Sequence, residues 1–452
     1  MARAVRAKDV TAVSLAKAAL EAAHTKAALN AFITLDDDRA LAAARHVDTM
    51  IANGDNPGDL AGVPIVIKDN INVAGMRTTA GTPAIDYVAD VSAPVAARLE
   101  AAGAVIIGKT NMHELAFGVT SDNATYGTVH NPVDPSRIPG GSSGGTAAAV
   151  AAGIVPAGLG SDTAGSVRLP AALCGVVGLR PTTWRVDQAG VVPSVPTFDV
   201  VGPLARNVQD AALMNAVTTG APMPDRRAID TLRLGVARPY IDNLSPAVAT
   251  AFDDALATLR KAGATLVDID LTSVSTASFE IGYPVGFFEM KRALSAFLAP
   301  HQAMTDLQAI VDEIASDDVK AVYVNAVLGD DAPDEAAYRQ AIARIGDVKA
   351  DYLRHLDGHG IEALVFPAAP LEAQPIEGLA ETVMLNGQAI PTTPAYIRNL
   401  APTVIYGAPG LSLPLATNGN ALPVGLELDG VPDGDADLLS IGLAVEAALA
   451  TD

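Results

Sequence analysis

Two serines flanked by glycines, together with one lysine, are the residues of this chain whose types and spacing suit nucleophilic chemistry. Ser142 lies in the segment 139–146 (PGGSSGGT), and Ser166 lies 24 positions later in the segment 160–170 (GSDTAGSVRLP). Small residues in such loops permit positive φ angles and let several backbone N–H groups point at one atom. Because a serine hydroxyl is a weak nucleophile at neutral pH, either serine needs an adjacent base.

Lys68 is the first candidate for that base. It follows the continuous apolar run 63–67, which is the pattern of a buried strand, and open α/β sheets place ligands at strand ends. Burial lowers the pKa of a lysine, so that the neutral amine is populated. Lys109 is the rival base, for which a structural or surface role is the alternative interpretation. Of the seven histidines, only His113 and His130 are near either loop in sequence.

Three other interpretations of the segment 139–146 compete with a catalytic one. A phosphate-binding loop lacks its Gly-Lys-Ser/Thr ending here. A nucleophile elbow matches Gly-x-Ser-x-Gly at 141–145, but the preceding residues 134–139 (DPSRIP) do not form a strand pattern. A flexible linker is the usual role of an isolated Gly/Ser run. The second glycine-flanked serine, in 160–170, favours a functional role for this segment over a flexible loop.

Strand and helix patterns alternate along the chain and predict an α/β fold with a mixed, largely parallel central β-sheet covered on both faces by helices. The segment 272–354 is expected to be almost wholly helical. Apolar periodicity predicts helices at 10–23, 39–51, 94–102, 246–262 and 435–450, and strands at 31–34, 63–69, 104–107, 232–236, 265–269, 364–367, 411–415 and 423–428.

Composition limits the class of protein. With 452 residues, half of them apolar, the chain can bury a large core, and we interpret 1–452 as a single domain. A formal net charge of −21 repels phosphate backbones and argues against nucleic-acid partners. The lone Cys174 excludes an internal disulfide and a multi-thiolate metal site, and its apolar neighbours favour a small core residue.

The sequence indicates no targeting or membrane segment. Residues 1–20 have no uninterrupted apolar stretch of the signal-peptide kind, and no apolar run of about 18 residues occurs. We therefore expect a soluble cytoplasmic protein, monomeric or homodimeric. His355 and His359 have the i, i+4 spacing of metal ligands, but Gly358 argues against a continuous helix there and no third ligand is near, so no metal is expected.

The chain resembles the amidase-signature family of Ser–Ser–Lys hydrolases. The similarity extends from about residue 10 to the C-terminal helix, and its densest part, 63–203, contains the catalytic core motifs. The shared segments are 66–70 (VIKDN), 108–112 (GKTNM), 139–145, 160–170, 178–182 (GLRPT) and 199–203 (DVVGP). Within the family, the flanking segments 112–121 and 423–430 are most similar to bacterial indoleacetamide and mandelamide hydrolases.

This resemblance implies a role for each matching residue. Ser166 is expected to be the acylated nucleophile, Ser142 a bridging serine held by a cis peptide, and Lys68 the base. The resemblance also implies an oxyanion hole made by the backbone N–H groups of Thr163, Ala164, Gly165 and Ser166. A buried charged network of structural rather than chemical role is expected from Asp162, Arg168 and Asp199.

The acyl side of the substrate is expected to meet Ala116, Phe117, Gly118 and Gly141. The helical segment 272–354 is interpreted as an insertion or lid over the substrate pocket. This segment carries a cluster of large apolar residues, Phe279, Tyr283, Phe287 and Phe288, and such residues at helical spacing are more often core than ligand contacts. Tyr283, Phe287 or Phe288 are the candidates for the pocket.

Two positions depart from the family pattern. Ala164 replaces a common glycine, and if that position needs a positive φ, alanine adds roughly 1 kcal/mol of strain. Thr146 replaces a common serine but keeps the hydroxyl group.

The expected function is hydrolysis of amide C–N bonds through a serine acyl-enzyme, without a cofactor. Aryl or arylalkyl amides are favoured by the resemblance, and the same chemistry accepts esters and carbamates. One alternative is a broad urethanase or arylamidase. Another is an amidotransferase A-type subunit that supplies ammonia to a tRNA-bound acyl group, against which the net charge of −21 argues. A catalytically inactive binding protein is disfavoured by the intact Lys68, Ser142 and Ser166.

Overall fold

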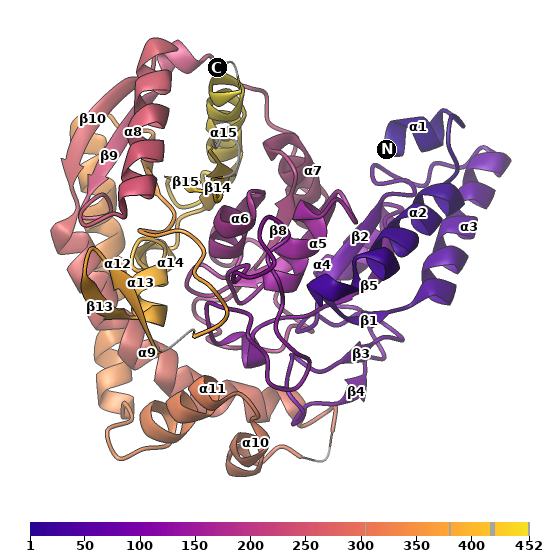
Figure 1. The fold of residues 1–452 in the computed structure, drawn as a ribbon, viewed down its shortest axis with the longest axis horizontal. Helices are drawn as coiled ribbons and strands as arrows, with labels where there is room; N and C mark the ends of the chain where they lie inside the picture. Colours follow the sequence, from indigo (N-terminus) through magenta and orange to yellow (C-terminus); the bar gives the residue numbers. More distant parts are fainter. Residues whose placement is uncertain (303, 379–380, 416–420, 451–452) are drawn as a thin grey trace.

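An eleven-stranded β-sheet runs through the computed structural model, which describes residues 1–302, 304–378, 381–415 and 421–450 (Figure 1). The strands follow one another across the sheet in the order β1-β5-β2-β6-β8-β7-β14-β15-β11-β9-β10. Their bounds are β1 Phe32–Leu35, β2 Pro64–Lys68, β5 Val105–Thr110, β6 Ala157–Asp162, β7 Val177–Arg180, β8 Val200–Ala205, β9 Arg233–Arg238, β10 Thr265–Asp270, β11 Ala363–Pro367, β14 Gly410–Pro414 and β15 Gly425–Asp429. Two short hairpins lie outside it: β3 Arg77–Thr78 with β4 Tyr87–Val88, and β12 Thr382–Leu385 with β13 Gln388–Pro391.

Parallel and antiparallel pairings occupy different parts of this sheet. Strands β5, β2 and β6 are parallel neighbours, and so are β11, β9 and β10. Between these two groups, the pairs from β6 through β8, β7, β14 and β15 to β11 are all antiparallel, and β1 adds an antiparallel edge. The predicted mixed α/β sheet is confirmed, with its antiparallel strands concentrated in the middle.

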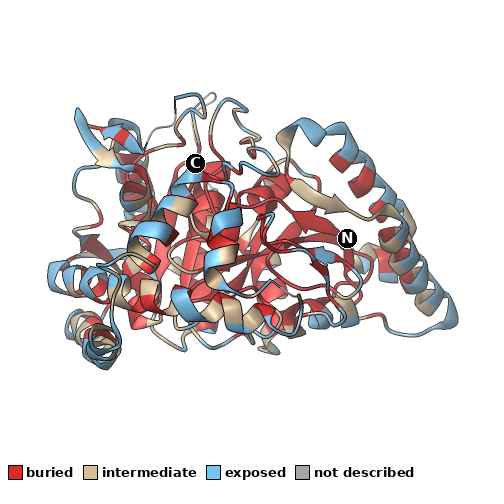
Figure 2. Cartoon of the chain, turned by 90° about the horizontal axis from the view of Figure 1, so that it is seen from below, coloured by how far each residue is buried: buried red, intermediate tan, exposed pale blue. Residues whose placement is uncertain are grey.

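Helices cover both faces of the sheet, because successive strand side chains point to opposite sides. Ile65 and Ile67 pack into one core cluster, whereas Val66 packs into another. The first cluster lies under α4 (Pro94–Ala101), α7 (Val208–Thr219), α8 (Pro246–Lys261) and α15 (Asp435–Leu449). The opposite face carries α2 (Ala12–Thr25), α3 (Asp37–Asn53), α5 (Gly144–Ala151), α6 (Arg168–Cys174), α9 (Thr272–Leu298), α12 (Glu335–His359) and α14 (Ala401–Tyr406). Figure 2 shows the resulting buried layer between exposed helix faces.

Side-chain caps fix where several predicted helices begin. The Thr11 hydroxyl accepts a hydrogen bond from Ser14 N at the start of α2, and Ser245 caps α8 directly before Pro246. Both are favourable N-terminal arrangements, because a cap satisfies a free N–H and proline lacks the donor that would be unpaired. The elements from 232 to 269 and from 435 to 449 lie within a few residues of their predicted bounds.

The segment 272–354 is helical, as predicted from its sequence. It contains α9, α10 (Leu307–Glu313), α11 (Asp317–Val322), a short π-helical turn at Tyr323–Val327 and most of α12. Helix α9 packs along α12 and α14, and α10 and α11 lie together at the lower edge of the molecule in Figure 1. Among the described residues, no helix is both long and apolar enough to cross a membrane.

Candidate active site

The predicted base and the bridging serine are in direct contact. Lys68 is the last residue of β2, and its Nζ donates a hydrogen bond to Ser142 Oγ at 2.7 Å. Both side chains are fully buried, and the peptide bond between Gly141 and Ser142 is cis. A second acceptor for Lys68 Nζ is Ser161 Oγ at 3.0 Å, which also accepts from Asn70 Nδ2 at 3.0 Å. The amine is thus held between two hydroxyl groups.

Burial changes the protonation of this lysine. Loss of hydration lowers the pKa of Lys68 to about 7, against the opposing influence of the negative charges of Asp162 and Asp199. A large fraction of the amine is therefore neutral near pH 7, as a general base requires.

Lys109, the rival base, is committed to other partners. Its Nζ lies 3.2 Å from Asp69 Oδ1 and donates to Thr78 Oγ1 at 3.2 Å. Burial lowers the pKa of Lys109 as well, but its recorded contacts include neither Ser142 nor Ser166. The contacts of Lys109 with other described residues therefore favour a structural role for this lysine.

Ser166 lies in a tight turn between a strand and a helix. Strand β6 ends at Asp162 and α6 begins at Arg168, so Ser166 is displayed just before a helix. A nucleophile elbow needs this strand–turn–helix arrangement, which the sequence lacks before Ser142. The main-chain oxygen of Ser166 accepts a hydrogen bond from Ser143 N at 3.1 Å, which ties the two glycine-flanked loops together. The Ser166 residue is partly exposed and lines a cavity.

The Asp162 carboxylate shapes this turn. It accepts hydrogen bonds from Gly165 N at 2.8 Å and Val167 N at 3.2 Å. The N–H of Gly165, one of the four predicted oxyanion donors, is therefore already used inside the loop. Gly165 has a φ of 118°, whereas Ala164 is not among the positive-φ residues, so the strain expected for alanine does not arise.

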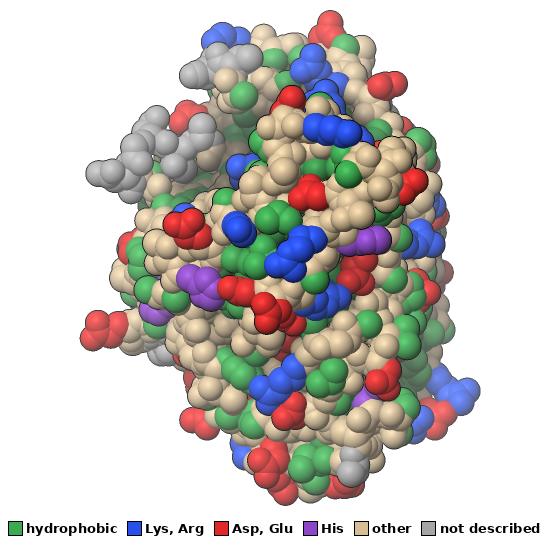
Figure 3. Space-filling model, turned by 90° about the vertical axis from the view of Figure 1, so that its right-hand side faces the viewer, with side chains coloured by type: hydrophobic (Ala, Val, Ile, Leu, Met, Phe, Trp, Pro, Cys, Tyr) green, Lys and Arg blue, Asp and Glu red, His purple; other side chains and the backbone are tan. Residues whose placement is uncertain are grey.

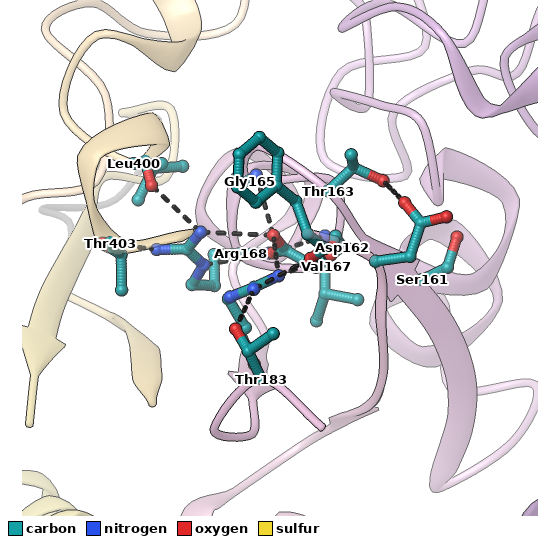
Figure 4. Close-up of polar contacts among 12 residues, drawn as sticks. Ser161, Asp162, Thr163, Gly165, Val167, Arg168, Thr183, Leu400 and Thr403 are labelled. Atoms are coloured by element: carbon teal, nitrogen blue, oxygen red, sulfur yellow. Dashed lines mark hydrogen bonds and ion pairs between the residues drawn. The ribbon is translucent and has the colours of Figure 1, made fainter. Parts of the chain in front are cut away.

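Two arginines neutralise Asp162 in the interior. Arg168 Nε lies 3.0 Å from Asp162 Oδ2 (Figure 4). Arg180 Nη1 lies 3.3 Å from Asp162 Oδ1. Burial alone would raise the pKa of Asp162, but these two guanidinium charges hold it well below its usual range. Burial lowers the pKa of Arg180 to about 10, against the attraction of Asp162. Arg168 Nη1 also lies 3.1 Å from Oε1 of Glu427, a residue of strand β15 that is distant in the sequence.

Asp199 supports the same loop without joining this ion pair. Its carboxylate accepts from Thr163 Oγ1 at 2.6 Å and from Ser194 N at 2.8 Å. Burial raises the pKa of Asp199, which these hydrogen bonds oppose. The predicted network of Asp162, Arg168 and Asp199 therefore consists of two adjacent parts, with Arg180 as an additional cation.

A cavity of about 360 Å³ opens at Ser166. Ala116, Phe117, Gly118 and Gly141 line it, as expected for substrate contacts. No charged side chain is among its described lining residues. The opposite walls come from α9 and from the region of α14, and include Phe279, Tyr283, Phe287, Ile397, Val404 and Ile405.

One predicted aromatic contact is wrong. Phe288 does not line the cavity; its ring stacks on Tyr338 with centroids 4.4 Å apart, and Arg292 lies 4.6 Å from its centroid. Helix α9 turns the stripe that contains Gly286 and Phe287 toward the cavity, and Phe288, about 100° further around the helix axis, lies outside that stripe. The aromatic residues that α9 contributes to the cavity follow the i, i+4 series from Phe279 through Tyr283 to Phe287.

The whole chain matches known amidases. The amidase family model covers residues 14–439. The chain belongs to the amidase family. Relatives include an indoleacetamide hydrolase of Allorhizobium ampelinum, 36% identical over 98% of this chain and 96% of its own length, and a mandelamide hydrolase of Pseudomonas putida, 35% identical over 98% and 90%. A crystal structure of an amidase, 33% identical, superposes with a TM-score of 0.88 over 99% of this chain and 98% of that one.

The protein is accordingly an enzyme that hydrolyses amide C–N bonds, and the resemblance stated from sequence is confirmed. The A-type subunit of the glutamyl-tRNA(Gln) amidotransferase of Koribacter versatilis is also similar, at 33% identity over 99% of this chain and 97% of its own length.

The other residues singled out from the sequence, Cys174, Thr146, His113 and His130, form hydrogen bonds or polar contacts outside the Lys68–Ser142 pair. Cys174 is buried, donates to Pro139 O, and burial raises the pKa of its thiol. The Thr146 hydroxyl keeps a hydrogen bond, 2.7 Å from Thr110 Oγ1. His113 is buried and its ring contacts Asp318 Oδ2 at 3.0 Å, while His130 Nδ1 is 2.7 Å from Pro135 O.

The two histidines at i, i+4 spacing lie in α12 and contact the backbone of their own helix. The helix continues through Gly358 to His359, contrary to the expected break. It ends at its C-cap, Gly360, which has a left-handed conformation. The Nδ1 atoms of His355 and His359 each lie 2.9 Å from the backbone oxygen four residues earlier. Within the described part of the chain, no group of three His, Cys, Asp or Glu residues is placed to hold a metal ion.

Four polar residues of the site were not predicted. Ser161 contacts Lys68, and Arg180, Glu427 and Asp429 complete the buried charge network. Arg180 lies within the shared segment 178–182, but the sequence did not indicate its role in the charge network. The signal for Glu427 and Asp429 was two carboxylates, two positions apart, in an otherwise apolar strand, where unpaired charges are costly.

Proposed function

We propose that this amidase cleaves neutral amides with an aryl or arylalkyl acyl group through a covalent intermediate on Ser166. The observation that carries the proposal is the buried Lys68–Ser142 contact of 2.7 Å beside the Ser166 loop. Lys68 acts as the base and Ser142 as the proton relay. Their positions in the sequence also agree with the resemblance to Ser–Ser–Lys hydrolases.

The proposed reaction has two halves. Neutral Lys68 takes a proton from Ser142 while Ser142 takes one from Ser166, and Ser166 Oγ attacks the carbonyl carbon. The Lys68 ammonium returns the proton through Ser142 to the leaving amine as the C–N bond breaks. Water then attacks the ester carbonyl, giving up its proton to the same relay, so that the carboxylic acid is released and Ser166 regains its hydroxyl hydrogen.

Backbone donors next to Ser166 stabilise the tetrahedral intermediate in this proposal. The N–H groups of Thr163, Ala164 and Ser166 are the proposed donors, each worth roughly 3 kcal/mol to the transition state by analogy with other oxyanion holes. Gly165 serves a different purpose: its N–H donates to Asp162 and fixes the shape of the turn.

The cavity supports a neutral, apolar acyl group. Its lining combines aromatic and aliphatic side chains with a few hydroxyl groups, and no charged side chain is among the described lining residues. A carboxylate or ammonium on the acyl group would lose its hydration there without a partner. The related indoleacetamide and mandelamide hydrolases are named for amides of this kind.

Carbamates and esters are proposed as secondary substrates, because serine attack on either carbonyl needs no further residue. The amidotransferase alternative receives support from the Koribacter versatilis relative, but a net charge of −21 opposes tRNA binding. On the face shown in Figure 3, acidic and basic side chains are interspersed rather than gathered into a basic patch. The segment 272–354 is proposed to close the substrate pocket, and a cytoplasmic monomer or homodimer remains the expectation from sequence.

Turnover of four matched substrates tests this function. Phenylacetamide, phenylacetanilide, a phenyl carbamate and a phenylacetate ester are compared, with Ser166→Ala as the control variant. We expect fast cleavage of the two amides, and accumulation of an acyl-enzyme detectable by mass spectrometry with the ester. Preference for the carbamate would favour a urethanase. Hydrolysis that survives in Ser166→Ala would refute the serine mechanism.

A further inference from the structure

Five of the described glycines line the cavity, and the local structure requires glycine at only some of these positions. A Cβ atom on Gly118 would come within 2.2 Å of the His113 ring, and one on Gly141 within 2.9 Å of Gly118 O. Gly165 has a φ of 118°, and a Cβ there would lie 2.8 Å from Leu400. Each of these three is needed for close packing or for a backbone conformation that side chains disfavour.

Gly282 and Gly286 have neither requirement. Both lie inside α9 and neither has a positive φ. A Cβ on Gly282 would be 3.9 Å from Ile405 Cδ1, and one on Gly286 would be 3.9 Å from Val195 Cγ2, which are ordinary van der Waals separations. Glycine inside a helix is less favourable than alanine, and nothing in the packing of α9 against its neighbours compensates for that.

What these two glycines do provide is space beside Ser166. Ile405 and Val195 are themselves cavity walls, so a methyl group on either glycine would project into the cavity between α9 and the opposite wall. The series Ser278, Gly282 and Gly286 places small residues along one helical stripe, beside the aromatic series that ends at Phe287. The wall that α9 contributes to the cavity therefore combines small and aromatic residues; this part of the cavity is called the slot below.

The size of the slot indicates what enters it. An apolar cavity of about 150 Å³ holds one benzene molecule, and this one measures about 360 Å³. We propose that Gly282 and Gly286 determine acyl-group size in this amidase, and that they admit a flat acyl group of two rings. This inference rests on the proposed function, since it places the acyl group in the cavity at Ser166.

The test compares acyl groups that share one leaving group. The p-nitroanilides of acetic, phenylacetic and 2-naphthylacetic acid are assayed with Gly282→Ala, Gly286→Ala and the double variant. Gly346→Ala is the matched control, because Gly346 lies inside α12 and an added Cβ meets nothing within 4 Å. The readouts are the ratio of kcat/KM for the naphthyl and acetyl substrates, and the Tm of each protein.

We expect each cavity substitution to lower the naphthyl-to-acetyl ratio by roughly tenfold or more, and the phenyl-to-acetyl ratio by less. The Tm should rise by roughly 1 °C for each cavity substitution and for Gly346→Ala, because alanine is the better helix former. Gly346→Ala should leave the ratio unchanged. An unchanged ratio in the cavity variants would overturn the assignment. So would a lower Tm, since it would show that the glycines stabilise α9, which contains Pro284 in its interior, instead.

Binding separates this inference from the proposed function. Phenylacetamide and 2-naphthylacetamide are titrated calorimetrically into Ser166→Ala and into the same protein carrying Gly286→Ala. A naphthyl-to-phenyl Kd ratio that rises about tenfold supports the size role even if the turnover panel finds no amidase activity. Equal ratios in the two proteins reject it, whatever the panel shows.

Discussion

Acid pH should switch off this enzyme through Lys68. Burial lowers the pKa of Lys68 from 10.5 to about 7, and the proposed base is the neutral amine. With that pKa, the neutral fraction is about one half at pH 7, about one tenth at pH 6 and about one hundredth at pH 5. A lysine at its ordinary pKa of 10.5 would be neutral in only about one molecule in 3,000 at pH 7.

The expected profile of kcat/KM therefore rises tenfold per pH unit below about pH 6.5 and flattens above about pH 8. It is measured with a neutral amide such as phenylacetanilide, whose own ionisation does not change between pH 5 and pH 9. Ser161→Ala is the companion variant. Removing the hydroxyl that accepts from Lys68 Nζ at 3.0 Å should lower kcat by roughly tenfold and move the acid limb to lower pH.

The lowered pKa of Lys68 also affects how the free energy of unfolding depends on pH. Between pH 7 and pH 10.5 the unfolded chain binds a proton at Lys68 that the folded chain does not, so this group makes the free energy of unfolding rise with pH in that window. The comparison is wild type against Lys68→Met by denaturant titration at pH 6, 8 and 10. The difference between the free energies of unfolding of the wild type and the variant should change in favour of the wild type as the pH rises. A flat activity profile from pH 5 to pH 9, or an acid limb near pH 10, would refute the assignment of Lys68 as the base.

Two further predictions concern the loop and the cavity. Asp162→Asn leaves Arg168 and Arg180 buried without their shared carboxylate, so the free energy of unfolding should fall by about 3–5 kcal/mol in denaturant titrations; a loss below about 1 kcal/mol would contradict the role of this ion pair. Phe287→Ala should raise KM for phenylacetanilide, whereas Phe288→Ala, outside the cavity, should lower Tm and leave KM unchanged; equal effects on KM would contradict the orientation of α9.

Local signals in the sequence were sufficient for most elements and for the principal residues of the site. The apolar run before Lys68 predicted a buried strand with the lysine at its end, which β2 confirms. The antiparallel middle of the sheet has no comparable signal, because β7 pairs with β14, which lies far along the chain, and β6 pairs with β8 rather than with the next strand, β7. Periodicity describes how one element faces the core, but not which strand lies next to it.

Contacts between distant segments account for what was missed in the site. Glu427 meets Arg168 across 259 positions, and no local pattern links the two. The use of the Gly165 N–H by Asp162 is likewise invisible in the sequence, since it depends on the conformation of the turn. Phe287 and Phe288 were equivalent candidates until the rotation of α9 about its own axis was fixed by packing.

The charged network has a consequence for the base beyond holding the loop. Lys68 contacts Ser161, the residue directly before Asp162, so an unpaired Asp162 would favour the ammonium form of the lysine. Arg168 and Arg180 place two positive charges on that carboxylate and offset its field, while Asp199 lies in a separate hydrogen-bonded cluster. The Asp162 carboxylate can thus organise the Ser166 turn while its effect on the pKa of Lys68 is reduced. Burial is the cause of the low pKa of Lys68, and the two arginines offset part of the charge by which Asp162 raises it.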